Sequence, residues 1–123
     1  MEAKLPPRVD GKFLEVDGRR VLIKGVAYGT FAPDGEGAQF PAAERIEQDF
    51  ALMAAAGINT VRTYTPPPPA LLDAALRHGL RMMIGLAWPQ HIPFLDDRRL
   101  TRKIRCDATA DVRRMAAHPA ALL

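Results

Sequence analysis

Apolar and polar positions alternate along the chain in a way that predicts strands and helices in turn. Two strand-like runs flank Asp17-Gly18, a pair that favours a tight hairpin because both central turn residues need positive φ. The second run continues to Tyr28 with little polar alternation, as in a strand buried on both faces. The β-branched and apolar runs at 58–64 and 80–88 predict two further strands.

Three helices are predicted between and after these strands. Ile46, Phe50 and Met53 recur at i, i+4 and i+7, which places an apolar stripe on the first helix. The helices are expected to run from Pro41 to about Gly57, from Pro69 to His78, and from about Arg99 to Ala117. Residues 120–123 have the apolar character of a following strand.

The resulting order is a hairpin followed by three strands that alternate with helices. This order indicates an α/β fold with a parallel sheet and right-handed crossovers. A sheet of three parallel strands leaves one edge unpaired, and an unpaired edge favours association with another chain. We therefore expect a marginally stable unit that self-associates through its open sheet edge.

Composition and charge narrow the function classes only slightly. The 123 residues are 48% hydrophobic and 25% charged, which is typical of a globular protein. The net charge is +3, and the basic excess is concentrated at 98–105. This run has no interleaved aromatic side chains to stack on bases, so we expect no nucleic-acid partner.

The cysteine count and the apolar runs lead to expectations about disulfides, membrane contact and cellular location. Cys106 has no second cysteine with which to form an internal disulfide. The N-terminus has no apolar leader, and no apolar run approaches the roughly 20 residues that span a bilayer. We expect no membrane contact by this segment and, by default, a cytoplasmic location.

Five side chains are expected near the carboxyl ends of the parallel strands, where α/β folds bind ligands. They are Tyr28, Arg62, Tyr64, Trp88 and His91. Aromatic faces stack on apolar sugar faces and polar tips bond to hydroxyls, so this set suits a saccharide. Packing in the mouth of the sheet is the alternative for Tyr28 and Trp88. Arg62 lies within an apolar strand, where a buried guanidinium is costly unless a carboxylate pairs with it.

No catalytic pair emerges from the residues. The acidic residues near strand ends are Asp34, Glu36, Asp96 and Asp97. We expect all four to be solvated loop charges rather than the two facing carboxyl groups of a glycosidase. The sequence shows neither metal-ligand spacing nor a Gly-rich phosphate motif, so we expect no metal and no cofactor.

The segments 16–29, 49–53 and 57–64 together resemble the clan A glycoside hydrolases, closest to barrels of the family 2 and family 5 type. In particular, they are similar to the barrel domain found beside a family 2 glycosyltransferase in some bacterial glucan-assembling proteins. The resemblance covers about 11–123. Its most specific part is Gly57-Ile58-Asn59-Thr60-Val61-Arg62-Thr63-Tyr64.

The resemblance implies the start of a (β/α)₈ TIM barrel, about three βα units preceded by the N-terminal β-hairpin. Residues 1–10 would form an N-terminal tail and residues 11–123 the barrel part. Arg62 would support the catalytic carboxylates and Trp88 would lie at a sugar subsite. In this clan an Asn-Glu pair on strand four supplies the acid/base. Asn59, the only asparagine, is followed by Thr60, so both catalytic glutamates are expected beyond the end of this chain.

Three hypotheses from different classes follow. The first is a fragment of a retaining glycosidase or transglycosylase that binds β-glucan-like saccharides and is inactive alone. The second is a small α/β interaction module that completes its sheet with a partner chain. The third is a basic nucleic-acid binder that uses Arg98 to Arg105, which would show steeply salt-dependent binding.

Overall fold

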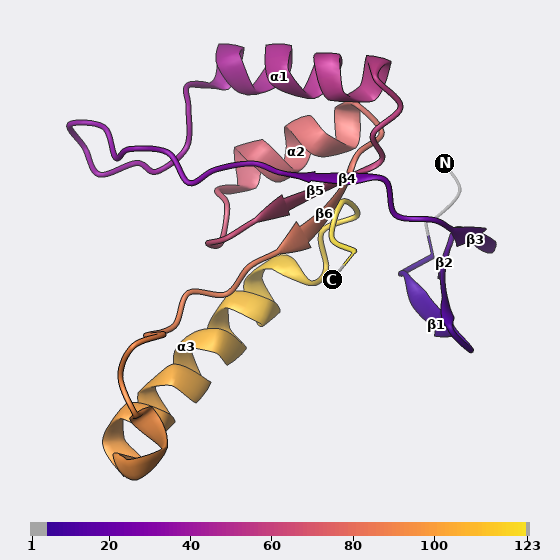
Figure 1. Ribbon diagram of the computed structural model, residues 1–123. Helices are drawn as coiled ribbons and strands as arrows, with labels where there is room; N and C mark the ends of the chain where they lie inside the picture. The colour runs from indigo at the N-terminus through magenta and orange to yellow at the C-terminus, as the bar shows by residue number, and fades with distance from the viewer. Residues whose placement is uncertain (1–4, 123) are drawn as a thin grey trace.

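The computed structural model describes residues 5–122 and contains two three-stranded sheets and three α-helices. The elements of the first sheet are β1 (Arg8–Asp10), β2 (Phe13–Val16) and β3 (Arg19–Val21). The rest of the chain forms β4 (Gly25–Ala27), α1 (Ala43–Ala55), β5 (Thr60–Thr63), α2 (Pro69–Arg77), β6 (Arg81–Ile84), the short 3₁₀ helix η1 (Phe94–Asp96) and α3 (Arg98–Met115). Strands and helices alternate from β4 onward, which confirms the predicted α/β class (Figure 1).

The first sheet is antiparallel and contains the predicted hairpin. β2 pairs with β3, with Val16 opposite Arg19, and the connecting Asp17 and Gly18 have φ values of 51° and 77°. These positive angles confirm the Asp-Gly turn. β1 pairs with the other side of β2. Residues 8–10, which were expected in an N-terminal tail, therefore form a third strand.

The expected long second arm of the hairpin is instead two strands in different sheets. β3 ends at Val21, and β4 begins at Gly25 in the second sheet. Between them, the Asn59 side chain accepts a hydrogen bond from the Lys24 N–H at 2.9 Å and donates one to the Leu22 carbonyl at 2.8 Å. Asn59 thus hydrogen-bonds to backbone groups between β3 and β4 that have no partner strand. The chain passes from the first sheet to the second at this point.

The second sheet is parallel, as the alternation of strands and helices predicted. β5 pairs with β4 on one side and with β6 on the other, and the register places Ala27, Arg62 and Met83 side by side. Met82 also forms an isolated parallel bridge with Ala121, which lies in the segment expected to start a following strand. Within residues 5–122 this sheet remains open and does not close into a barrel.

One face of the parallel sheet is covered by α1 and α2, which lie together on the same side of it (Figure 1). Phe50 of α1, Leu71 of α2, and Val61 and Met82 of the sheet are all 0% exposed. Each such side chain contributes about 1.5–3 kcal/mol when it is buried. The opposite face has no helix over it, and this asymmetry decides which side chains are free to bind a ligand.

A polar contact also joins α1 to the end of α2. The carboxylate of Glu47 binds the guanidinium of Arg77 and the ring of His78. The hydrogen bond from Arg77, and then that from His78, lowers the pKa of Glu47. Because the folded-state pKa is depressed, this contact stabilises the fold when Glu47 is ionised, and the stabilisation is lost as the pH falls.

The amino end of the parallel sheet is tied to the hairpin and to the chain end by two further side chains. The Arg81 guanidinium bonds to Asp17 at 2.9 Å and to the Pro119 carbonyl at 2.6 Å. The His118 ring bonds to Asp73 of α2 at 2.7 Å. These contacts hold the hairpin turn and the turn before Ala121 against the same end of the sheet.

Gly85, just after β6, lies where a side chain would collide with the neighbouring strand. A Cβ at this position would be 2.6 Å from both the carbonyl carbon and the oxygen of Tyr64. We expect Gly85→Ala to lower the free energy of unfolding by about 1–3 kcal/mol, the range of overpacking, as measured by urea denaturation. Gly35→Ala is the matched control, because a Cβ there meets nothing within 4 Å. Equal stability of the two variants would contradict this packing.

Candidate functional site

The carboxyl ends of the three parallel strands meet at one edge of the sheet. The Tyr28 N–H donates to the Arg62 carbonyl at 2.8 Å, and the Gly85 N–H donates to the Thr63 carbonyl at 2.9 Å. These bonds hold the ends of β4, β5 and β6 level, so the segments that follow the strands leave from a common edge. Ligands of parallel α/β proteins gather at this edge.

Arg62 is exposed, which corrects the expectation of a buried guanidinium. Its neighbours Val61 and Thr63 are 0% exposed, but Arg62 lies on the face of β5 that α1 and α2 leave uncovered. Its guanidinium carbon is 4.9 Å from the centre of the Tyr64 ring, and Tyr64 is 45% exposed. Such a cation–π contact is worth about 0.5–1 kcal/mol at an exposed site. Water solvates this guanidinium, so its position requires no buried carboxylate.

Tyr28 lies on the opposite face from Arg62. Ala27 is the residue that pairs with Arg62, and successive strand residues alternate between faces. Tyr28 is only 6% exposed, its ring packs edge-on against Phe50 with centroids 5.3 Å apart, and its hydroxyl donates to Asp49 at 2.7 Å. Burial, and then this hydrogen bond, raises the pKa of Tyr28 above its usual value. This is the geometry of a core side chain with a satisfied hydroxyl.

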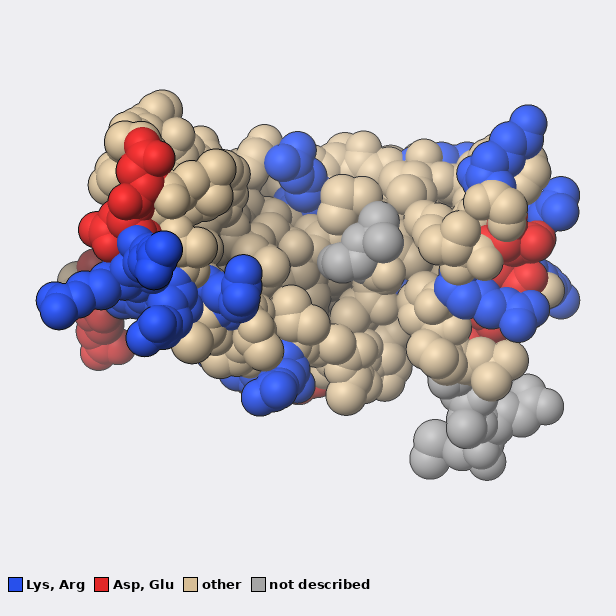
Figure 2. Space-filling model, turned by 90° about the horizontal axis from the view of Figure 1, so that it is seen from below, with Lys and Arg blue, Asp and Glu red and all other residues tan. Residues whose placement is uncertain are grey.

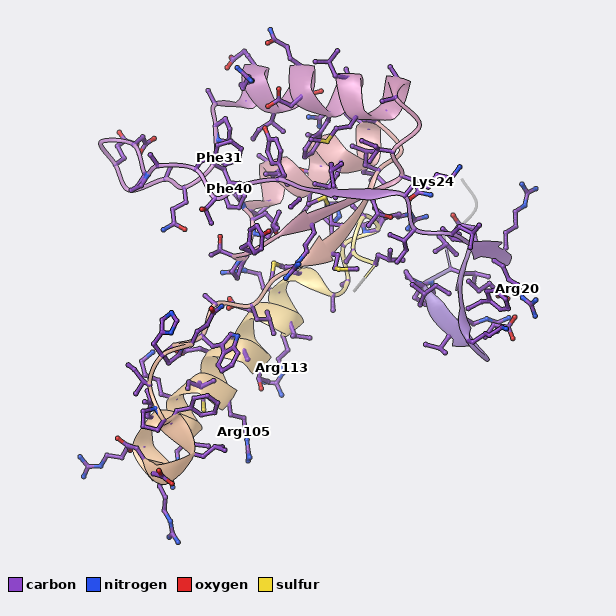
Figure 3. All side chains as sticks on the ribbon, viewed as in Figure 1. Arg20, Lys24, Phe31, Phe40, Arg105 and Arg113 are labelled. Atoms are coloured by element: carbon purple, nitrogen blue, oxygen red, sulfur yellow. The ribbon has the colours of Figure 1, made fainter. Side chains whose placement is uncertain are left out.

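The loop between β4 and α1 folds back onto Tyr28. The Phe31 ring lies 4.9 Å from that of Tyr28 and 6.4 Å from that of Phe40, at the base of the loop (Figure 3). Tyr28 and Tyr64 both line a small depression of about 10 Å³ there, which is the room of about one water molecule. The sequence suggested only a Gly-rich loop at 29–39, although the two phenylalanines on either side of Gly35 and Gly37 were a signal for this anchoring.

Trp88 and His91 lie farther along the chain, in the segment between β6 and η1. Trp88 is 48% exposed, and its ring meets that of Phe94 edge-on, with centroids 5.3 Å apart and planes at 88°. His91 is exposed. The structure thus brings Arg62 and Tyr64 into direct contact, whereas the aromatic neighbour of Trp88 comes from η1.

A larger groove, of about 410 Å³, shares Phe40 with the small depression. It is lined by Ala38, Phe40, Pro41, the proline run 66–69 and Arg114. From the sequence the proline run was expected only to break a strand and start a helix, so its role as a groove wall was missed. Proline and phenyl rings form a rigid apolar wall that suits the apolar face of a sugar ring, and Arg114, which also binds Asp111 at 2.9 Å, is the polar group.

The acidic residues near the strand ends include two with structural roles. Asp34 accepts hydrogen bonds from two N–H groups of its own loop. Asp97 caps α3 by accepting from the N–H groups of Arg99 and Leu100. Within residues 5–122, no three His, Cys, Asp or Glu side chains gather as metal ligands. None of the helices in this range combines the length and apolar character needed to cross a membrane.

Comparison with known proteins finds solved structures whose fold resembles that of this chain. No protein-family model and no curated protein matches the chain. The β-glucuronidase of Bifidobacterium dentium, complexed with coumarin-3-O-glucuronide, matches with a TM-score of 0.74 and 16% identity over 94% of this chain and 19% of its own. The Ruminococcus gnavus β-glucuronidase, complexed with a C6-substituted uronic isofagomine, gives 0.73 and 17% over 94% and 20%. A glycosyl hydrolase family 2 member from Bacteroides cellulosilyticus gives 0.67 and 21% over 96% and 15%.

These similarities are similarities of fold. The chain spans a fifth or less of the length of each of these three proteins. Nearly all of its described elements therefore have counterparts within one part of larger glycoside hydrolases. The shared fold alone does not assign the activities of those hydrolases to this chain.

Tyr28 offers a test of which aromatic side chains belong to the core. We expect Tyr28→Phe to lower the free energy of unfolding by about 1 kcal/mol, because the ring packing remains while the hydrogen bond to Asp49 is lost. In the control Tyr64→Phe, an exposed hydroxyl is removed, and stability should stay within about 0.5 kcal/mol of wild type. Thermal denaturation measures both. A larger loss in Tyr64→Phe than in Tyr28→Phe would contradict this assignment.

Proposed function

We propose that this chain forms the first three βα units of a (β/α)₈-barrel glycoside hydrolase of the retaining type, acting on β-glucan-like saccharides by hydrolysis or transglycosylation. Residues 11–123 would be the barrel portion and residues 1–10 a preceding segment. The observation that carries the proposal is the exposed Arg62–Tyr64 stack at the carboxyl edge of an open parallel sheet. That edge is where barrel enzymes bind their substrates. The fold shared with β-glucuronidases and a family 2 glycosyl hydrolase supports it.

The uncovered face around Arg62 is suited to polar recognition. In the sheet register Arg62 lies between Ala27 and Met83, and neither carries a charge that would neutralise it. A guanidinium presents five N–H donors in a fixed plane, so it can hold sugar hydroxyls or orient carboxylates beside the scissile bond. In this proposal Arg62 supports the catalytic carboxylates, as the family resemblance implies, and Tyr64 fixes the guanidinium plane and contacts the sugar.

The remaining site residues take different roles. The exposed ring of Trp88 would stack on a sugar face, and His91 would bond to hydroxyls from the same segment. Tyr28 would support the site from beneath, because its hydroxyl is occupied by Asp49 and its ring is buried. No cofactor takes part in this chemistry, since glycosidic bonds are cleaved by two carboxyl groups and water.

We assign neither catalytic glutamate to this chain. Among the described residues, the glutamates lie on the hairpin, in a loop and on α1, and they are Glu15, Glu36, Glu44 and Glu47. None is at the carboxyl end of a parallel strand. The chain would therefore contribute substrate-binding surface and show no turnover by itself.

A small α/β interaction module is the second candidate, and one observation favours it. Residues 120–122 pair with β6 only at Met82, so among the described residues the rest of this edge has no partner strand and a strand from another copy could add there. An apolar cleft of about 130 Å³ at this position is lined by Ile84, Leu86, Val112, Met115, Ala116 and Ala121. This candidate predicts a stable oligomer without saccharide affinity.

Trp88 is the single tryptophan of the chain, so its fluorescence reports directly on the proposed site. We expect titration with β-glucan oligosaccharides to change the emission. Arg62→Ala should weaken the apparent affinity about tenfold, the effect of losing one hydrogen bond to a charged group. Because Arg62 is exposed, the free energy of unfolding should change by no more than about 0.5 kcal/mol beyond the lost stacking on Tyr64.

Arg19→Ala is the matched control for this titration. Arg19 is exposed on the hairpin, so its replacement removes the same charge far along the chain from the proposed site and should leave the titration unchanged. Light scattering of the same samples separates the two candidate functions. A stable oligomer with no fluorescence response would overturn the saccharide proposal, and loss of folding in Arg62→Ala would show that the arginine is architectural.

A further inference from the structure

The exposed side of α3 carries a line of arginines that the proposed saccharide site does not use. Arg98, Arg102, Arg105 and Arg113, here called the arginine stripe, recur at i, i+4, i+7 and i+15, and all four are exposed. This spacing places them within a sector of roughly 80° around the helix. Figure 3 shows Arg105 and Arg113 leaving α3 on the same side. In Figure 2, Lys and Arg side chains gather over the end of the molecule that α3 forms.

Charge is segregated around α3. Seven basic and two acidic residues give the helix a formal charge of +5, more than the +3 of the whole chain. The two acidic residues, Asp107 and Asp111, lie on the opposite side of the helix and bind Lys103 and Arg114. No acidic residue of α3 lies within the sector of the arginine stripe, which extends about 22 Å along the helix with a gap of about 12 Å between Arg105 and Arg113.

The side of α3 that faces the protein is the one next to Asp107 and Asp111. Leu100 and Ile104 are half-buried, and Met115 is 4% exposed. The Thr101 hydroxyl donates to the Phe94 carbonyl at 2.5 Å. Packing of α3 therefore uses the apolar side and leaves the arginine stripe to solvent.

We propose that the arginine stripe binds an acidic polysaccharide, a linear chain with carboxylates repeated along its length. Each guanidinium matches a carboxylate through two parallel N–H···O bonds. Successive stripe positions 98, 102 and 105 are separated by about 4.5 to 6 Å of helix rise, comparable with the length of one sugar ring.

The choice of a saccharide rests on the proposed function and on the direction of α3. The amino end of α3 lies well beyond the carboxyl ends of β5 and β6, on the same side of the molecule (Figure 1). A long saccharide that passes the sheet edge can therefore continue along the helix. The arginine stripe is then an accessory binding line for those saccharide chains that also carry carboxylates.

The composition of the sector favours a polysaccharide over single-stranded nucleic acids and lipid surfaces. Between the arginines it holds Thr109, which is exposed. It has no aromatic side chain to stack on unpaired bases. It also has no large apolar side chain to enter a lipid surface, as interfacial helices do.

Binding of the whole chain to three probes tests this inference: polygalacturonate, a neutral β-glucan of similar length and a duplex DNA. We expect polygalacturonate to bind with an affinity that falls as NaCl is raised, because salt screens exposed charges. The double variant Arg105→Gln/Arg113→Gln should weaken this binding roughly tenfold, the combined effect of two exposed ion pairs. The control Lys12→Gln/Arg19→Gln removes the same charge from the hairpin, where both residues are exposed, and should leave the affinity unchanged.

The other outcomes would contradict either the arginine stripe, the choice of a polysaccharide or the proposed function. Equal losses in the stripe variant and the hairpin control would show a general charge effect and overturn the arginine stripe, as would absence of polygalacturonate binding. Tighter binding to the duplex DNA would replace the polysaccharide with a nucleic acid. Retained polygalacturonate binding without β-glucan binding would count against the proposed function alone.

Circular dichroism checks that the variants keep their helix content. Arg105→Lys/Arg113→Lys, which keeps the charge, should retain more affinity for polygalacturonate than the glutamine variant.

Discussion

Backbone hydrogen bonding between parallel strands is the constraint on which the rest of this structure depends. The register that places Ala27, Arg62 and Met83 in one row also places Val61 and Met82 against the helices. Because side chains alternate along each strand, this one register divides the sheet into a buried face and an open face. The absence of a side chain at Gly85 lets β6 approach the end of β5 closely enough to keep that register.

The division into two faces gives a small unit a packed core and, on the other side, a surface that can bind a ligand. Apolar side chains from α1, α2 and the sheet fill the covered face, while polar links such as Glu47 with Arg77 and Arg81 with Asp17 join separate elements. Of these residues, only Tyr28 also belongs to the proposed saccharide site, which it supports from beneath. Changes at Arg62 or on the arginine stripe can therefore alter binding with little effect on folding, which is the property expected of a surface that selects a ligand.

Most of the architecture could be predicted from the sequence, because periodicity and turn chemistry are local. The Asp17-Gly18 turn, the three helices and the parallel order all follow from such signals. Register is not local, and this is why Tyr28 was expected beside Arg62 although it lies one residue past the partner of Arg62 and on the other face. The exposure of Arg62 was missed for a similar reason, since its strand is apolar only at the positions that face the helices. The break after Val21 depended on Asn59, a residue 38 positions further along the chain, whose side chain binds the connecting backbone.

Native-state amide hydrogen exchange tests the parallel register most directly. Exchange rates should be slow at Tyr28 and Gly85, whose N–H groups donate to the carbonyls of Arg62 and Thr63, because exchange there requires the strands to separate. They should be much faster at Gly35, in the exposed loop. If Tyr28 and Gly85 exchanged as fast as Gly35 while the hairpin amides stayed protected, the three strand ends would not share an edge and the open binding face would not exist.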